Sequence, residues 1–308
     1  SGKTRVAQLI AEAASIHVPV IVIDPIGEFT GMIRENTDSS KKDFTEFKLP
    51  QAKAYDFARI CTLDEGGVQF RANLLKKPEV EAEEPLISNA DQTAILLSEL
   101  AGDERFRDTI REVLFESWQR YGDLRFENFM EAVKEKAQRK KISVKLDRLF
   151  QYKILLSESN LSVERLLNSR LTVLSLSAYQ YSPTAKIMVS WFLLREILNY
   201  FLAQPSTEQL KALVVVDEVH RFYEPDIPRN AASMLEGIVK QGRSKGLGVV
   251  MTTQTIKDLS EVVTQANLRV LLKVLEGEMQ MYGQKFGMDL ARTLHGLDPK
   301  ERIGYVFY

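Results

Sequence analysis

The stretch from Leu213 to Gln254 constrains the fold more than any other part of this sequence. It opens with a short apolar run, Leu213 to Val216, that is rich in β-branched residues and stops at two adjacent carboxylates, Asp217 and Glu218. A run of this length and composition is typical of a strand that is buried on both faces of a parallel sheet. Ligands of open α/β sheets bind at the carboxyl ends of such strands. We therefore expect an α/β fold with a functional site at this edge.

A second strand is predicted at Val249 to Thr252, and it would bring the Gln254 side chain to the same edge of the sheet. Between the two strands, a helical segment closes on a polar, glycine-flanked corner that contains Arg243. The pattern indicates that acid, amide and guanidinium groups gather on one face of the molecule.

The chain begins with the second half of a phosphate-binding loop. Ser1, Gly2, Lys3 and Thr4 match the end of the pattern G-x-x-x-x-G-K-S/T, and a helical pattern follows directly. In such a loop, backbone N–H groups at a helix N-terminus hold phosphate oxygens. The lysine reaches the β- and γ-phosphates, and the hydroxyl ligates Mg²⁺. We therefore expect ATP to bind at Ser1 to Arg5, with Mg²⁺ held by Thr4.

With a phosphate-binding loop in the chain, the polar groups of the opening stretch acquire specific roles. Asp217 would hold Mg²⁺, directly or through water, and Glu218 would deprotonate the attacking water as general base. Gln254 would contact the γ-phosphate or position that water. Arg243 would act on a neighbouring subunit's nucleotide as an arginine finger, a device that accelerates hydrolysis by about 10³–10⁵-fold. Each role has a structural alternative. Asp217 and Glu218 would then be only the polar end of a strand. Gln254 would be a buried side chain that satisfies backbone groups, and Arg243 a solvated residue at a helix end.

A further strand, Val18 to Ile23, also stops at a carboxylate, in the sequence Asp-Pro-Ile-Gly-Glu-Phe that begins at Asp24. Proline and glycine force a turn at this point. Asp24 and Glu28 are possible accessory residues that tune the nucleotide site or the Mg²⁺ shell, and structural capping of the turn is the alternative.

The periodicities divide the chain into a sheet-forming part and a helical part. Residues 1–30 and 170–308 are predicted to form a RecA-like ATPase core with a central, mainly parallel sheet, and residues 31–169 a mostly helical insertion. The remaining expected elements are strands at Leu171–Leu176, Leu268–Leu275 and Ile303–Phe307, a short strand or edge at Val68–Leu75, a helix from Ser182 to about Phe201 and a helix around Ile256–Val263.

Composition restricts the partners. The formal net charge of −1 provides no global basic footprint, so nucleic acid would have to meet a local basic surface such as a ring's channel. The run that includes Arg139 and Lys140 is more typical of a solvated helix face than of a DNA groove.

One cysteine excludes an intrachain disulfide and fits a reducing, cytoplasmic location, and three scattered histidines argue against structural zinc. No apolar run approaches the length of a membrane span.

Five motifs together resemble the HerA branch of the HerA/FtsK family of P-loop ATPases. They are Gly-Lys-Thr at Gly2 to Thr4, the D-P-x-G-E-F/Y signature at Asp24 to Phe29, the strand that ends at Asp217-Glu218, the Gly-Arg segment at Gly242 to Gly248, and Thr253-Gln254. The resemblance implies a homo-hexameric ring that moves along double-stranded DNA using ATP and Mg²⁺, with Arg243 as the finger between subunits. It also implies a partner such as a nuclease, in DNA-end processing or anti-phage defence.

The chain departs from the family pattern in two places. Ile26 stands where HerA proteins usually have histidine, which puts a role for that side chain in doubt. The first half of the phosphate-binding loop and the family's N-terminal β-barrel are absent from the chain.

Three other functions compete with a HerA-type motor. Asp217 to His220 also resembles the DExH box of two-lobed helicases, but the 308 − 220 = 88 residues that follow are too few for a second RecA-like lobe. We therefore expect another subunit to complete the site. A secretion or conjugation ATPase of the VirB4 or coupling-protein type is the second alternative. The third is a scaffold ring that activates a nuclease or NAD-consuming effector, with ATPase activity serving regulation.

Overall fold

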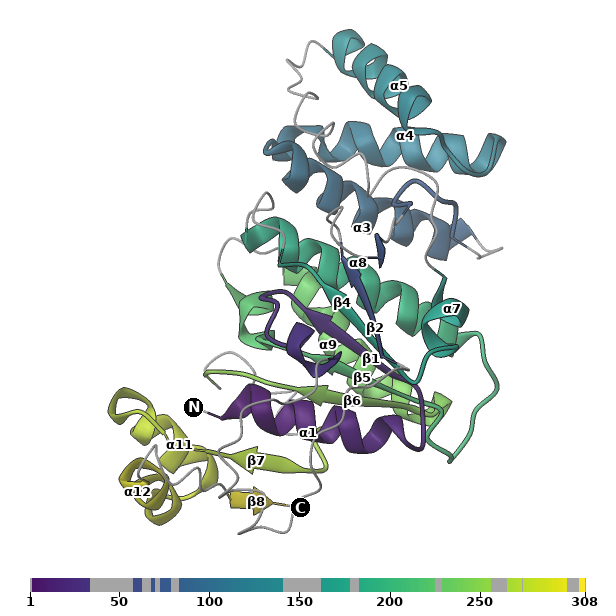
Figure 1. Cartoon of the computed structure of the whole chain (residues 1–308). Helices are drawn as coiled ribbons and strands as arrows, with labels where there is room; N and C mark the ends of the chain where they lie inside the picture. The colour runs from purple at the N-terminus through teal and green to yellow at the C-terminus, as the bar shows by residue number, and fades with distance from the viewer. Residues whose placement is uncertain are drawn as a thin grey trace. The chain divides into compact units, whose positions relative to one another are not determined.

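The computed structural model describes residues 2–33, 58–62, 68–69, 73–78, 83–140, 162–177, 183–224, 229–255, 265–272, 274–297 and 305–307. The chain divides into two compact units (Figure 1). The first, the sheet unit, comprises Ser1–Thr62, Val163–Ala178 and Leu193–Tyr308. The second, the helical unit, comprises Leu63–Ser162 and Tyr179–Phe192.

The main sheet has the strand order β3-β2-β4-β1-β5-β6. Its strands are β1 (Val20–Asp24), β2 (Ala58–Thr62), β3 (Val68–Gln69), β4 (Leu171–Ser175), β5 (Ala212–Val216) and β6 (Leu247–Met251). The pairs β2–β4, β4–β1, β1–β5 and β5–β6 are all parallel. The expected α/β fold with a mainly parallel sheet is therefore confirmed.

Strands β1, β4 and β5 form the centre of the sheet, and every residue in each of them is buried. On one face, helix α1 (Lys3–Ser15) packs its small residues Ala7 and Ala11 against alternate strand residues such as Val20 and Val22. Small side chains allow the helix to lie close to the sheet. Each fully buried valine or leucine contributes about 1.5–3 kcal/mol relative to an exposed one, so this layer holds the start of α1 firmly over the strands.

Helices and 3₁₀ turns connect the strands. The helices are α7 (Val163–Leu167), α8 (Pro183–Leu202) and α9 (Arg229–Gly242), and the 3₁₀ turns are η1 (Thr30–Ile33), η4 (Val219–Tyr223) and η5 (Arg243–Lys245). Gly237 of α9 faces Leu198 of α8, where an added Cβ would lie 3.6 Å from the leucine side chain. The predicted helix around residues 256–263 lies outside the described residues.

The last part of the chain forms a small layer of its own. Strands β7 (Arg269–Leu271) and β8 (Tyr305–Phe307) pair antiparallel. The turn η6 (Glu276–Glu278) leads into helices α11 (Met279–Phe286) and α12 (Met288–Gly296), which the sequence analysis did not predict. A compact cluster of Leu271, Val274, Tyr282, Ala291 and Leu294 holds these elements together.

Strand β2 is the main element of the sheet that the sequence analysis missed. It lies within residues 31–169, which were assigned to the helical insertion, and it pairs with β4 from Ala58↔Leu171 to Thr62↔Ser175. The predicted strands Val18–Ile23, Leu171–Leu176 and Leu213–Val216 match β1, β4 and β5 to within two residues at either end. Strand β6 starts at Leu247, two residues before the predicted start.

The helical unit contains α3 (Glu83–Ala101), η2 (Glu104–Phe106), α4 (Arg107–Arg120) and α5 (Phe126–Arg139). Its buried side chains include Trp118, whose indole N–H donates to the backbone oxygen of Leu75 at 2.9 Å. Within the described part of the chain, no helix combines the length and the apolar character that a membrane span requires.

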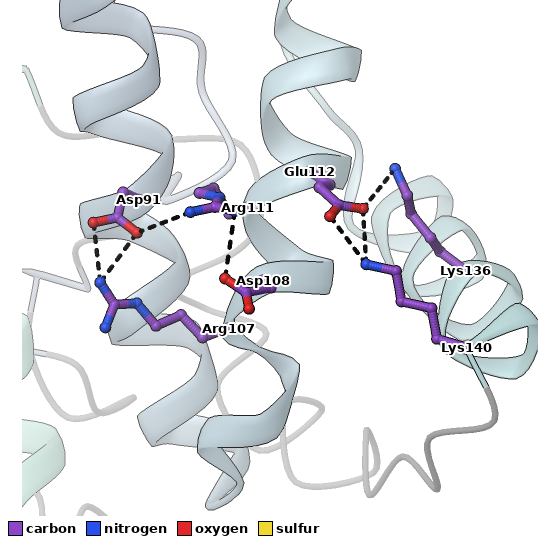
Figure 2. A network of polar contacts seen from close by, with 7 residues as sticks. All are labelled: Asp91, Arg107, Asp108, Arg111, Glu112, Lys136 and Lys140. Carbon is purple, nitrogen blue, oxygen red and sulfur yellow. Dashed lines mark hydrogen bonds and ion pairs between the residues drawn. The ribbon is translucent and has the colours of Figure 1, made fainter.

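Ion pairs link the three helices of this unit (Figure 2). Asp91 of α3 pairs with Arg107 and Arg111 of α4, and Glu112 of α4 pairs with two lysines, one in α5 and one directly after it, at 3.2 and 2.9 Å. The lysines are Lys136 and Lys140. Because these groups are partly exposed, each pair contributes only about 0–1 kcal/mol. The basic side chains at the end of α5 therefore pair with acidic side chains of the same unit, as is typical of a solvated helix face.

Candidate functional site

The start of α1 has the backbone arrangement of a phosphate-binding helix end. Gly2 caps the helix in the left-handed region, with φ 81°, and Lys3 and Thr4 form the first turn. Glycine adopts that conformation without the penalty that a Cβ brings. Its lack of a side chain also leaves the first N–H groups of the helix without a side-chain cap, and such groups attract anions. Ser1 lies outside the described residues.

The positive charge of Lys3 acts on the acidic edge of the sheet. Burial lowers the pKa of His220, which lies in η4 directly after β5, and the charges of Arg221 and Lys3 act in the same direction. The carboxylate of Glu218 opposes them. The start of α1 and the carboxyl end of β5 therefore lie close enough for their charges to interact.

Asp217 is fully buried, with none of its surface exposed. Its Oδ1 atom accepts a short hydrogen bond from the Thr252 hydroxyl. Its Oδ2 atom is buried without a hydrogen-bond partner among the described residues. Burial raises the pKa of Asp217 to about 6, the charges of Glu218, Asp24 and Glu28 add to that effect, and the bond from Thr252 opposes it.

Glu218 has an unusual backbone. Its φ of 56° and ψ of 42° lie in the left-handed region, which no other non-glycine residue of the described ranges occupies. This conformation costs a non-glycine residue about 1–2 kcal/mol, and such strain is concentrated at functional sites. The residue is only 5% exposed, and the Gln254 amide donates to both oxygens of its side chain at 2.8 and 2.9 Å. His220 and Arg221 lie 3.5 and 3.7 Å from Oε2.

Gln254 and Glu218 therefore meet at the edge where the sequence analysis placed them. A carboxylate held by an amide on one side can still accept a proton from water, because each oxygen carries two lone pairs. The arrangement can serve general-base chemistry, with Gln254 at the distance needed to orient the base or its water.

Asp24 caps the loop that follows β1. One of its oxygens accepts from the N–H groups of Gly27 and Glu28 at 2.7 and 3.2 Å, and the other accepts from Phe29 at 2.9 Å. Burial raises its pKa and these backbone bonds oppose the rise. Both oxygens are thus engaged by the loop, as structural capping requires. The Glu28 side chain is exposed, and its backbone oxygen accepts from Gln8 of α1 at 2.9 Å.

Gly27 allows this loop to lie against the sheet. It has φ 97°, and an added Cβ would lie 2.8 Å from the Cβ of Ser177. A side chain at this position would therefore be strained by its backbone and blocked by its neighbour.

Arg243 lies apart from the acidic edge, so the expectation that it shares one face with the carboxylates is wrong. It begins η5, which precedes β6, and the following residues bond to the segment that precedes β5: Lys245 Nζ donates to the Gln204 oxygen at 2.8 Å. These contacts are at the amino edge of the parallel sheet, whereas Asp217 and Gln254 follow the carboxyl ends. The physical reason is the β-α-β connection, which returns the chain to the amino edge before each new strand. Arg243 itself is exposed.

Thr252 is a member of the site that the sequence analysis overlooked. Its hydroxyl donates to Asp217 and accepts from the N–H of Glu218 at 3.1 Å. The available signal was the parallel pairing of the two predicted strands, which sets the residue after one strand beside the carboxylates after the other. The sequence analysis treated this threonine only as a strand end.

The residues present fit a Mg²⁺ ion that is shared with a nucleotide. Thr4 presents a hydroxyl in the first turn of α1, and Asp217 presents the unpaired Oδ2 atom. Within the described ranges, no group of three or more His, Cys, Asp or Glu residues forms a protein cage for a metal. Mg²⁺ in phosphoryl-transfer sites needs no such cage, because one or two protein ligands, water and phosphate oxygens complete its shell.

Comparison with curated proteins finds sequence similarity to archaeal helicases. No protein-family model matches the chain. It is 32% identical over 96 residues to the probable DNA double-strand break repair helicase HerA of Methanocaldococcus jannaschii and 29% identical over 96 residues to a probable helicase of the same organism. Each match covers 30% of this chain and no more than 19% of the relative. The resemblance to HerA-type ATPases is thereby confirmed in sequence.

Solved structures share the fold over most of the chain. VirB4 of Thermoanaerobacter pseudethanolicus has a TM-score of 0.63 at 14% identity, covering 98% of this chain and 80% of its own. The plasmid coupling protein TrwB, in complex with ADP and Mg²⁺, has a TM-score of 0.59 at 12% identity, covering 98% of this chain and 75% of its own. At these identities the likeness concerns the fold, and it confirms the RecA-like architecture predicted from the sequence.

Proposed function

We propose that this chain hydrolyses ATP with Mg²⁺ at the site formed by the start of α1 and the carboxyl edge of the sheet. One observation carries the proposal: a buried Asp217 with an unpaired oxygen lies next to Glu218, and Gln254 holds the Glu218 carboxylate at 2.8–2.9 Å. A metal ligand, a general base and an amide in this relation are the parts that hydrolysis of a nucleoside triphosphate requires. The ADP and Mg²⁺ of the coupling-protein complex support the same cofactors.

In the reaction, the bond between the γ-phosphorus and the bridging oxygen breaks, and a bond to the water oxygen forms. Glu218 accepts the proton that the water loses, and Gln254 keeps the accepting carboxylate in place. Lys3 and the N–H groups at the start of α1 bind phosphate oxygens. Thr4 and Asp217 would hold Mg²⁺, which supplies positive charge to the phosphate oxygens when it is bound.

The proposal extends to a ring. We infer a HerA-type homo-hexamer that moves double-stranded DNA through its channel, with Arg243 of one subunit acting at the nucleotide of the next. The exposed position of Arg243 at the amino edge supports this assignment, because a finger that acts in trans must be accessible to the neighbour. In this proposal the ring works with a nuclease or another effector protein, in DNA-end processing or anti-phage defence.

The variant E218Q tests the general base. It should bind ATP normally and hydrolyse it at least about 10²-fold more slowly, because glutamine cannot accept the proton. The matched control is E224Q, the same change at an exposed carboxylate that follows η4. Near-normal turnover of E218Q would exclude Glu218 as the base, and an equal loss in E224Q would indicate a general disturbance of η4.

Mixed rings test the finger. Subunits with R243A and subunits with K3A should each be inactive alone and should recover part of the ATPase activity when mixed, because each supplies what the other lacks. Absence of recovery, while both variants assemble, would contradict action in trans.

Stimulation of ATP hydrolysis by DNA tests which molecule the proposed motor moves. A translocase of double-stranded DNA should hydrolyse ATP faster when duplex DNA is added at low salt. Stimulation by single strands alone would favour a motor of the VirB4 or coupling-protein type, which shares the fold over 98% of this chain. A hexamer that no DNA stimulates would favour the scaffold function.

A further inference from the structure

Thr252 touches both acids of the proposed catalytic site through a single oxygen. Its hydroxyl accepts from the Glu218 N–H at 3.1 Å and donates to Oδ1 of Asp217. The residue is only 7% exposed, so water does not compete strongly for either bond. A hydroxyl has one donor proton and two lone pairs, so it can make both contacts at once.

The backbone fixes the position of this hydroxyl. The backbone N–H of Thr252 donates to the backbone oxygen of Val216 at 3.1 Å, and the backbone oxygen of Thr252 accepts from the Val219 N–H at 2.9 Å. These two bonds continue the pairing of β5 with β6 beyond the last regular residues of both strands. Thr252 therefore cannot slide along the acidic edge, and its Cβ is held opposite the two carboxylates.

Each contact has a separate consequence. Donation to Oδ1 orients the Asp217 carboxylate and leaves Oδ2 as the oxygen that has no hydrogen-bond partner among the described residues. Acceptance from the Glu218 N–H satisfies a buried donor in the left-handed turn, where the backbone is at its most strained. The left-handed backbone at this position directs the Glu218 carboxylate to Gln254.

We propose that Thr252 is a positioning residue that couples the two halves of the site. Its hydroxyl selects the Asp217 oxygen that meets the metal, and the same hydroxyl holds Glu218 in the conformation in which its carboxylate faces Gln254. The proposal rests on the proposed ATP hydrolysis, but it makes a separate claim about metal affinity. Groups that orient metal ligands through a hydrogen bond typically change metal affinity by about 10–100-fold when they are removed.

Three substitutions separate this role from simple loss of a buried hydrogen bond. T252V keeps the shape and removes both contacts, whereas T252S keeps the hydroxyl and removes only a methyl group. T172V is the matched control: Thr172 lies buried on β4, and its hydroxyl donates to the Leu166 oxygen at 3.2 Å, away from the acidic edge. The same chemical change is thus made within β4 and directly after β6, two strands of one sheet.

The first measurement is binding of Mn²⁺, as a paramagnetic stand-in for Mg²⁺, to the full-length protein saturated with ADP, followed by electron paramagnetic resonance. We expect the dissociation constant of Mn²⁺ to rise about tenfold or more in T252V and to stay within about threefold of wild type in T252S and T172V. Binding of ADP in the presence of a chelator should be the same in all four proteins. Equal Mn²⁺ affinity in T252V and T172V overturns the proposal.

The second measurement is ATP hydrolysis as a function of Mg²⁺ concentration. In T252V the half-maximal Mg²⁺ concentration should rise by the same factor as the Mn²⁺ dissociation constant, and the rate at saturating Mg²⁺ should also fall because Glu218 is less well held. A fall in rate with unchanged Mg²⁺ dependence overturns the coupling. If T252V does not fold, T252A is compared with T252S in both measurements.

The two proposals fail in different ways. A wild-type protein that binds Mn²⁺ with ADP but does not hydrolyse ATP overturns the proposed function, and the Mn²⁺ comparison of T252V with T172V still decides the role of Thr252. A wild-type ATPase whose T252V and T172V variants behave alike overturns only the role of Thr252.

Discussion

Replacing Asp217 by asparagine should change the stability of the metal-free protein in a pH-dependent way, with the free energy of unfolding of the variant rising relative to wild type as the pH rises. The folded protein raises the pKa of Asp217 from 3.8 to about 6, with burial as the largest cause. The folded state thus binds the proton more tightly than the unfolded state does. The corresponding contribution to stability is fully present below pH 3.8 and is lost as the pH rises through about 6. Asparagine does not titrate and avoids this loss.

The size of the effect follows from the shift. A rise from 3.8 to about 6 corresponds to roughly 3 kcal/mol, and about 2 kcal/mol of it develops between about pH 4 and about pH 7.5. Asparagine can still accept the Thr252 hydrogen bond through Oδ1, but its NH₂ group then occupies the place of the unpaired oxygen. That unsatisfied donor subtracts about 1–3 kcal/mol at every pH. The pH dependence of the difference is therefore more informative than its absolute value.

The assay is urea unfolding of wild type and D217N, followed by circular dichroism without metal or nucleotide across this pH range. The free energy of unfolding of D217N relative to wild type should increase steadily with pH. The variant D289N, at a fully exposed carboxylate of α12, reports the effect of removing a surface charge. Saturating ADP with Mg²⁺ should stabilise wild type more than D217N at neutral pH, because wild type alone keeps the metal ligand. A difference that is flat across the pH range would refute the reasoning from burial.

Three further substitutions test individual contacts by urea unfolding at neutral pH. D24N should lose about 2 kcal/mol, because its NH₂ group would face the buried Phe29 N–H, and an unchanged stability would contradict the capping role. W118F should also lose about 2 kcal/mol, because the Leu75 oxygen loses its buried donor, unless the phenyl ring repacks without cost. E112Q should lose less than about 1 kcal/mol at pH 7. Lys140 and Lys136 lower the pKa of Glu112, so this small contribution should vanish as the pH falls below 4.5, and a loss that persists there would point to packing instead.

The central strands could be predicted because their signal is local. Strands β1 and β5 are short apolar runs that stop at carboxylates visible in the sequence, and β4 combines leucine and valine with threonine and serine. Strand β2 has no such signal: its five residues, Ala58 to Thr62, include an arginine and an alanine and carry no apolar run. Its pairing with β4 joins residues that are more than 100 positions apart, and no local pattern reports that pairing.

The candidate site likewise contains residues that a local sequence signal predicts and residues whose role depends on how the strands align. Asp217, Glu218 and Gln254 could be proposed from their positions after predicted strands, since parallel strands end at one edge. The role of Thr252 depends on register, because its bond to Asp217 spans 35 positions and exists only when the two strands align as they do. The left-handed backbone of Glu218 has no sequence signal either, since glutamate rarely adopts it without support from surrounding structure.

The position of Arg243 has a consequence for how the site must be completed. Strand β6 has five residues and separates η5 from the segment that carries Thr252 and Gln254. At about 3.3 Å per residue, this separation is roughly 16 Å, which exceeds the reach of an arginine side chain. The Arg243 side chain therefore does not reach Thr252 or Gln254 of its own chain while the sheet is intact. If a cation from this corner stabilises the transition state, it does so in a neighbouring subunit. Dilution below the concentration at which subunits assemble must then abolish this contribution to the rate of ATP hydrolysis in wild type. The same dilution should leave the rate of R243A unaffected.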